Sequence, residues 1–116
     1  MEVPKKGQQW VFHGETLPEA PAPGIERRVL AWTDGLMCVE NRFEEGAVGT
    51  LHSHPHTQIT YVLEGKFSFT IGGETRVVRQ GDTLLKENGV VHGCVCLEKG
   101  ALLDIFSPAR MDFVQD

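Results

Sequence analysis

The sequence predicts an all-β fold, in which many short strands form one sandwich or barrel. The chain has 116 residues, which is enough for one domain with one core. From Arg27 onward, short apolar or alternating segments are separated by glycine-containing turns. No window keeps the 3.6-residue periodicity of an amphipathic helix. These observations together favour an all-β domain over a helical or mixed one.

The chain is expected to begin with an arm. Residues 1–26 hold four of the six prolines, a composition typical of an extended segment that does not join a helix. The barrel is expected over residues 27–110. A short C-terminal tail would then cover residues 111–116.

Turn signals divide the expected barrel into strands. Asp34-Gly35 is a strong hairpin signal, and Gly72-Gly73 is a second one. Phe67, Phe69 and Ile71 alternate with polar residues, as in a strand with one buried face. The expected strands cover residues 28–33, 36–43, 58–63, 66–71, 75–79, 83–86, 92–97 and 101–106.

Composition excludes several classes of partner. The net charge is −5 and the basic residues are mostly scattered, whereas a nucleic-acid-binding protein needs clustered Lys and Arg. No stretch approaches the roughly 20 apolar residues that cross a membrane, and the first residues lack the apolar run of a signal peptide. Three cysteines are few and odd in number, which fits a reducing compartment. We therefore expect a cytoplasmic protein that binds neither nucleic acid nor membrane.

Three histidines and one glutamine are the candidate metal ligands. His52 and His54 are one residue apart, so both side chains point to the same face if the segment is extended. His92 lies 38 residues after His54, and only a closed tertiary fold could bring it to the pair. Imidazole nitrogen binds zinc, nickel, copper and iron, and the carboxamide oxygen of Gln58 could complete the set. The alternative for each residue alone is an ordinary hydrogen-bonded or polar barrel residue.

The spacing around the first two histidines resembles the first motif of the cupin family. That motif reads Gly, five residues, His-x-His, three or four residues, Glu, six residues, Gly. Gly46, His52, His54 and Gly65 stand at the matching positions. Gln58 occupies the place where Glu is usual, so this chain departs from the family at one expected ligand.

The segment that contains the third histidine resembles the second cupin motif. Gly81, Gly89 and His92 match it, while Glu87 replaces its proline and Cys96 replaces its asparagine. The resemblance implies a double-stranded β-helix, which is a small jelly-roll barrel, with a metal ion inside its mouth.

The resemblance also implies one divalent transition metal ion, held by His52, His54, Gln58 and His92. Nickel, zinc, manganese, iron and copper are all compatible with these ligands. Three imidazoles and an amide are neutral, so the protein would not compensate the charge of the ion. Such an ion polarises a bound sugar oxygen more strongly than one with a carboxylate ligand. This favours Lewis-acid chemistry.

Two further stretches resemble a narrower group, the small cupins of pectin degradation. These stretches are residues 52–58 and 104–113. Members of that group open the ring of 4,5-unsaturated monouronates, which are products of pectin and alginate breakdown. The resemblance implies a ring opening to the linear keto-uronate, with a small anionic sugar acid as substrate. It also implies a homodimer, in which an arm carrying Trp10 and Phe12 packs on the partner.

Asp104, Phe106 and Arg110 are the candidate catalytic and substrate-binding residues. Asp104 lies in an apolar segment, where a carboxylate must be paired, hydrogen-bonded or functional, and it could act as general acid or base. Phe106 has the same strand parity and could form an apolar platform for substrate. Arg110 could grip a substrate carboxylate with two hydrogen bonds. The alternatives are a structural carboxylate that pairs with Arg110 or a backbone amide, a core phenylalanine and a solvated terminal arginine.

Two other functions stay open at this point. One is an iron-dependent dioxygenase, because three-histidine iron sites exist among cupins. The other is a non-enzymatic cupin that binds a small molecule without turnover. Consumption of oxygen would identify the first, and a bound ligand without turnover would identify the second.

Overall fold

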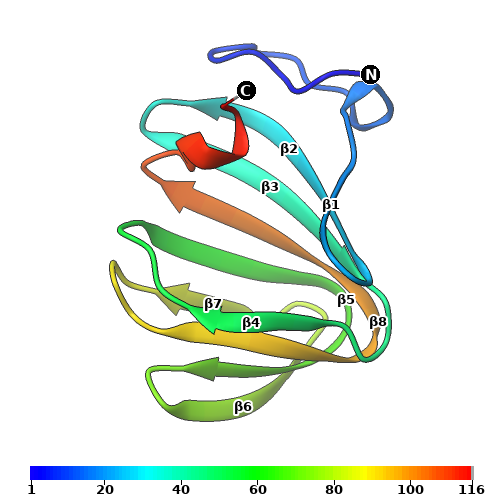
Figure 1. Ribbon diagram of the computed structural model, residues 1–116, viewed down its shortest axis with the longest axis vertical. Coiled ribbons are helices and arrows are strands. Elements are labelled where there is room, and N and C mark those ends of the chain that lie inside the picture. Colours follow the sequence, from blue (N-terminus) through cyan, green and yellow to red (C-terminus); the bar gives the residue numbers. More distant parts are fainter. Residues whose placement is uncertain (116) are drawn as a thin grey trace.

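The computed structural model describes residues 1–115, and it confirms the predicted all-β fold (Figure 1). The only helical elements in this part of the chain are two three-residue turns, and neither is long or apolar enough to cross a membrane. The elements in chain order are η1 (His13–Glu15), β1 (Glu19–Ala22), β2 (Ile25–Thr33), β3 (Leu36–Phe43), β4 (Val48–His52), β5 (Thr57–Ile71), β6 (Glu74–Arg79), β7 (Thr83–Lys86), β8 (His92–Ser107) and η2 (Met111–Phe113).

Two long strands, β5 and β8, connect both layers of the molecule (Figure 1). The second half of β8 pairs with β3 and with the first half of β5, which in turn pairs with β7. The first half of β8 pairs with β4 and with the second half of β5, which pairs with β6. All these pairs are antiparallel, so the chain folds back on itself as a jelly roll.

The sequence predicted a break in each of these long strands, at Gly65 and around residues 98–100. The structure instead has continuous strands with irregular register at that point. Gly65 has φ of +86°, and a Cβ atom on it would lie 2.6 Å from the Cα of Gly100. Glycine lets the two backbones bend past each other, so the turn signal marks a bend within a strand rather than its end.

Residues 1–26 lie along β2. β1 pairs with β2, and the Arg28 guanidinium donates to the Thr16 carbonyl at 2.7 Å. The indole N–H of Trp32 donates to the Pro4 carbonyl at 2.8 Å. Trp10 and Phe12 remain 75% and 61% exposed in the single chain. The division between an arm and a barrel at residue 27 stays a prediction.

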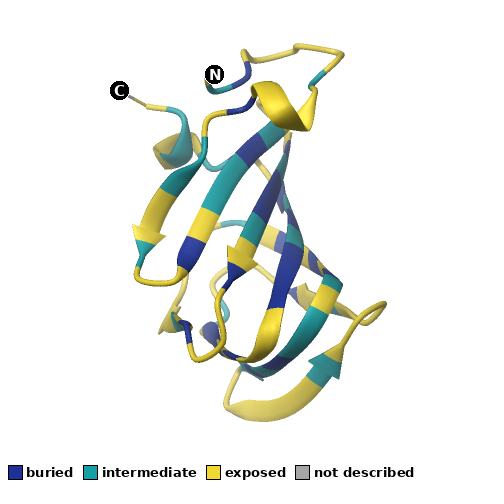
Figure 2. Cartoon of the chain, turned by 90° about the vertical axis from the view of Figure 1, so that its right-hand side faces the viewer, coloured by how far each residue is buried: buried dark blue, intermediate teal, exposed yellow. Residues whose placement is uncertain are grey.

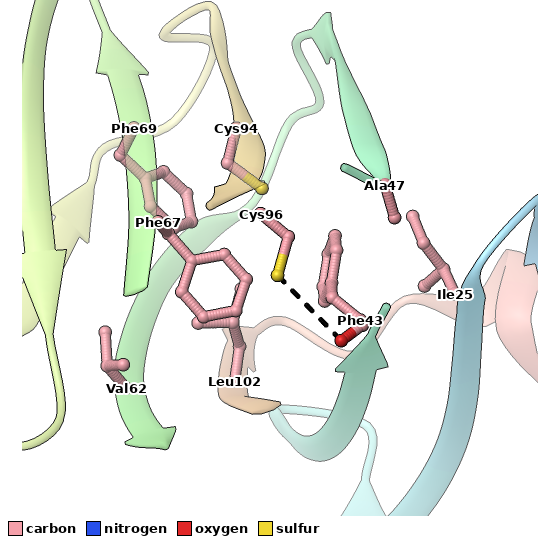
Figure 3. Packing of buried hydrophobic residues seen from close by; sticks show 9 residues of the cluster. All are labelled: Ile25, Phe43, Ala47, Val62, Phe67, Phe69, Cys94, Cys96 and Leu102. Atoms are coloured by element: carbon pink, nitrogen blue, oxygen red, sulfur yellow. Dashed lines mark hydrogen bonds between the residues drawn. The ribbon is translucent and has the colours of Figure 1, made fainter. Parts of the chain in front are cut away.

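Buried apolar side chains form two clusters on the inner faces of the strands. Buried residues concentrate on the central strands, while the turns and the N-terminal segment are mostly exposed (Figure 2). In the first cluster the Phe43 and Phe67 rings meet edge to face, with their centroids 5.3 Å apart (Figure 3). This first cluster contains Ile25, Phe43, Ala47, Val62, Phe67, Phe69, Cys94, Cys96 and Leu102, and the second contains Val29, Met37, Val39, Phe106 and Ala109.

A layer of polar side chains separates these two clusters. On β8, Asp104 lies between Leu102 of the first cluster and Phe106 of the second. Asn41 on β3 and Thr60 on β5 lie on the same inner face, as the strand register requires. Apolar residues here would extend the core without any desolvation penalty. The polar layer therefore needs an explanation beyond packing.

Candidate metal centre

The fold brings the three predicted histidine ligands together. His52 ends β4 and His92 begins β8, and the two are directly paired across these strands. His54 lies in the turn that follows β4. One nitrogen from each ring lies within 4.8 Å of the corresponding nitrogens of the other two, so the three side chains could hold a metal ion.

Backbone contacts fix the orientation of two of these rings. Nδ1 of His52 lies 2.8 Å from the carbonyl oxygen of Thr50, and Nδ1 of His92 lies 3.1 Å from that of Val90. A carbonyl only accepts hydrogen bonds, so each Nδ1 must carry the proton. Nε2 of both rings is then left with a free lone pair. This is the tautomer that a metal ligand requires.

Two of the histidines are held in the neutral form. Burial lowers the pKa of His54 to about 4, and the positive charge of Arg110 contributes to the shift. Burial also lowers the pKa of His92 to about 4, against an opposing hydrogen bond to Val90. Both rings therefore stay neutral at neutral pH, so a metal ion would not have to compete with a positively charged imidazolium.

Gln58 lies where it could supply a fourth ligand atom. Its Oε1 lies 3.1 Å from Nε2 of His54, and its Nε2 donates to Asp104 at 2.8 Å. Two atoms that each lie about 2.1 Å from one ion are about 3.0–3.4 Å apart in octahedral or tetrahedral geometry. The observed spacing fits that range. The residues present thus fit a divalent ion, with the amide oxygen and not the amide nitrogen toward the histidines.

Asp104 is the centre of a buried hydrogen-bond network. Its Oδ1 accepts from Gln58 and from the hydroxyl of Thr60, and its Oδ2 accepts from the Asn41 amide at 2.7 Å. Asp104 is 5% exposed, so these partners supply the hydrogen bonds that a buried carboxylate needs. The sequence did not predict the roles of Asn41 and Thr60.

Lys86 is a further buried residue that sequence reasoning missed. It is 2% exposed, its Nζ donates to the Thr60 hydroxyl at 2.7 Å, and it lies 4.6 Å from the centre of the Phe69 ring. Burial lowers the pKa of Lys86, and the Asp104 carboxylate opposes this shift. One signal was available, because Lys86 has the same strand parity as the inward-facing Leu84.

The side chains of His52, Gln58, Lys86, His92 and Asp104 line one cavity of about 300 Å³. Arg110 contributes to its wall, with its guanidinium 5.3 Å from the Phe106 ring centre and 4.3 Å from that of Phe113. Asp112 accepts from Nε and Nη2 of Arg110 at 3.0 and 2.9 Å, so Arg110 pairs with Asp112 and not with Asp104. The Nη1 nitrogen of the guanidinium group takes no part in this ion pair.

The wall of the cavity carries a second guanidinium group. Arg27 lies 3.9 Å from the Phe113 ring centre and lines the same cavity. It pairs with Glu19 at 2.9 Å. The protein is acidic as a whole, yet the charged side chains that line this cavity are Arg27, Lys86 and Arg110 against one carboxylate, Asp104. An anionic ligand would therefore meet a favourable local potential.

Cys94 also lines the cavity but has the wrong properties for a ligand. It does not belong to the group of side chains that could hold one metal ion together, and burial raises the pKa of its thiol to about 12. Cys96 belongs to the apolar cluster and donates to the Phe43 carbonyl at 3.8 Å (Figure 3). The two cysteines thus behave as small core residues.

The chain resembles known proteins in both sequence and structure. A sequence model of the cupin domain matches residues 39–106. The chain is 41% identical to the pectin degradation protein KdgF of Dickeya dadantii (strain 3937), over 92% of this chain and 99% of that protein. The structure of KdgF from Halomonas sp. superposes with a TM-score of 0.86 at 39% identity, covering 90% of this chain and 98% of that one. An RmlC-like cupin from Shewanella frigidimarina NCIMB 400 gives a TM-score of 0.90 at 38% identity, with 93% and 97% coverage.

Proposed function

The chain belongs to the cupin family, and from that premise we propose that it is a metal-dependent enzyme that opens the ring of 4,5-unsaturated monouronates. The substrates would come from pectin or alginate breakdown, and the product would be the linear keto-uronate. The likeness to a pectin degradation protein supports the substrate class.

One observation carries the proposal. A single cavity of about 300 Å³ is lined by His52, His92, Gln58, Asp104 and Arg110. It therefore combines a candidate metal centre, a carboxylate and a guanidinium, in a space that suits a single sugar ring. A uronate needs these three kinds of group, because it has hydroxyl oxygens, exchangeable protons and a carboxylate.

The proposed reaction is an isomerisation and needs no further reactant. The C1 hydroxyl loses its proton, the bond between C1 and the ring oxygen breaks, and an aldehyde forms at C1. The electron pair passes to the ring oxygen and gives an enolate across C5 and C4. A proton added at C4 leaves a ketone at C5. A bound divalent ion would supply Lewis acidity toward the sugar oxygens.

Asp104 is proposed to move the proton. Both lone pairs of Oδ1 are used by Gln58 and Thr60, whereas Oδ2 accepts only from Asn41 among the described residues. A carboxylate oxygen has room for two hydrogen bonds, so Oδ2 keeps one acceptor position. Oδ2 is therefore the atom that would take the proton and return it.

Arg110 and Phe106 are proposed to hold the substrate. Arg110 would grip the C6 carboxylate through Nη1, because Asp112 takes Nε and one N–H of Nη2. Phe106, whose ring lies 5.7 Å from that of His54, would pack against a face of the sugar. The two guanidinium groups in the cavity wall match a substrate with one negative charge.

The proposal is tested by adding metal-loaded protein to unsaturated monouronates prepared from pectin and from alginate. We expect the absorbance of the 4,5 double bond to fall faster than without protein, with no consumption of oxygen. Protein stripped of metal is the control. Unchanged absorbance with a bound ligand would indicate a non-enzymatic binding protein, and oxygen consumption would indicate the iron dioxygenase.

We also propose a cytoplasmic location and a homodimer. All three cysteines are unpaired in the described residues, which supports a reducing compartment. The large exposed fractions of Trp10 and Phe12 support a second chain at that end of the molecule.

A further inference from the structure

Lys86 occupies a position that the proposed chemistry does not require. Lysine is almost never fully buried unless it is paired, yet none of the described carboxylates lies within salt-bridge distance of its Nζ. Its one hydrogen-bond acceptor is the hydroxyl of Thr60, at 2.7 Å. The Phe69 ring, 4.6 Å away, favours the ammonium form. A buried cation costs stability, so its retention points to a role in the site.

The ammonium group of Lys86, which only donates, and the carboxylate of Asp104, which only accepts, together set the direction of the hydrogen bonds between them. Lys86 can only donate, so the Thr60 oxygen must accept. The Thr60 hydroxyl hydrogen is then directed to Oδ1 of Asp104. The same Oδ1 also accepts from Nε2 of Gln58, at 2.8 Å. This arrangement turns Oε1 of Gln58 toward His54, where the two atoms are 3.1 Å apart.

We propose that Lys86 is a positioning residue that helps to hold the amide oxygen of Gln58 toward the metal centre, acting through Thr60 and Asp104. An amide can present either oxygen or nitrogen, and only the oxygen is a metal ligand. Thr60 also accepts a longer bond from Nε2 of Gln58, at 3.4 Å. Without Lys86, the Thr60 hydroxyl can rotate away from the position in which it accepts from the amide and donates to Asp104, and the amide is held less firmly. The inference rests on the proposed metal site but not on the uronate substrate.

The test uses Co²⁺ as the metal probe, because its visible absorption reports the ligand geometry. Lys86→Met removes the donor and keeps an unbranched apolar side chain of similar length. We expect it to weaken Co²⁺ binding to the stripped protein about tenfold, as loss of an outer hydrogen-bond partner of a ligand does, and to change the absorption bands. Its melting temperature without metal should be equal or higher, since a buried charge is replaced by an apolar group.

Thr60 provides a matched pair of variants, which decide the question even if Lys86→Met fails to fold. Thr60→Val removes the hydroxyl at nearly constant shape and should reproduce the loss of affinity, whereas Thr60→Ser keeps the hydroxyl and should bind Co²⁺ as the wild type does. The double variant Lys86→Met/Thr60→Val should be no weaker than either single variant, because both interrupt one chain of bonds. Lys99→Met, at an exposed lysine outside the cavity, is the control.

Wild-type Co²⁺ affinity and spectrum in Lys86→Met, or equal affinity in Thr60→Val and Thr60→Ser, would overturn the inference. Turnover of uronate by the wild type would then still support the proposed function. Conversely, Lys86→Met could bind Co²⁺ more weakly while the wild type does not turn over uronate. That result would support the inference and contradict the substrate assignment.

Discussion

Arg110 has two edges on its guanidinium group, and Asp112 occupies one of them with bonds of 3.0 and 2.9 Å. The side chain is only 14% exposed and also packs on Phe106 and Phe113. Asp112 therefore holds the fork in a fixed orientation before a substrate arrives. The pKa of Asp112 is lowered by its hydrogen bonds with Arg110, so the pair persists in mildly acidic solution.

Arg110→Ala should raise KM strongly and change kcat less. It removes a carboxylate anchor in a partly desolvated site, where loss of such a pair costs about 2–5 kcal/mol. Steady-state kinetics on the unsaturated uronate measures both constants. Arg76→Ala, at an exposed arginine on β6, should leave both unchanged. An unaltered KM in Arg110→Ala would show that Arg110 does not bind the substrate carboxylate and has a structural role.

Asp104→Asn should lower kcat and leave KM nearly unaltered. The substitution keeps the shape of the side chain but removes proton transfer, which typically contributes about 10²–10⁴-fold to a rate. Single-turnover measurements with the same substrate separate this effect from product release. If Asp104→Asn turns over the uronate at the wild-type rate, Asp104 is a buried structural carboxylate.

The stability of the metal-free protein should fall as the pH decreases from about 6.5 toward about 4. His54 and His92 have folded-state pKa values of about 4, whereas an unfolded histidine has a pKa of about 6.5. Between these values the unfolded chain binds more protons, so acidification favours unfolding. Melting curves of chelator-treated protein at about pH 7.5 and about pH 5 test this. A His54→Gln/His92→Gln variant should show a smaller decrease.

At the scale of the elements, the crossing of β5 and β8 depends on two glycines. Gly65→Ala should destabilise the protein by more than about 3 kcal/mol, because the new Cβ would meet the Gly100 Cα at 2.6 Å and a carbonyl oxygen at 2.7 Å. Gly73→Ala is the matched control, since Gly73 also has φ of +86° but open space around it. That change should lower the free energy of unfolding only by the backbone strain, which is about 1–2 kcal/mol. Equal losses in denaturant titrations would contradict the steric argument.

The same crossing shows where prediction from sequence reaches its limit. The strands could be predicted from the alternation of apolar and polar residues and from the turn residues between them, because these are local properties of the sequence. The continuity of β5 through Gly65 depends on a second strand that approaches it from a distant part of the chain. A local pattern cannot distinguish a glycine that ends a strand from one that bends it.

The sequence could predict those site residues that belong to a motif with fixed spacing along the chain. His52, His54 and His92 do so, and the structure brings them together. Lys86 and Asn41 do not, because their roles come from strand pairing across the barrel. Strand parity places such residues on the inner face, but it does not say which polar partners they meet there.

At the scale of the whole molecule, we expect a homodimer. Trp10 and Phe12 are 75% and 61% exposed on the N-terminal segment, and aromatic side chains are enriched at protein interfaces. Light scattering should give a mass of twice 12.9 kDa. A Trp10→Ser/Phe12→Ser variant should shift the protein toward the monomer. A wild-type mass near 12.9 kDa would show a monomer and contradict this prediction.

The placement of β8 has a consequence for how a newly made chain reaches this state. β8 is the last strand to be synthesised, yet β3, β4 and β5 all pair with it. Until it leaves the ribosome, these three strands have unpaired edges that can join another chain. His92 also arrives with β8, so a nascent chain cannot capture a metal ion with all three imidazoles before then. Closure of the barrel and formation of the ion site therefore both require β8.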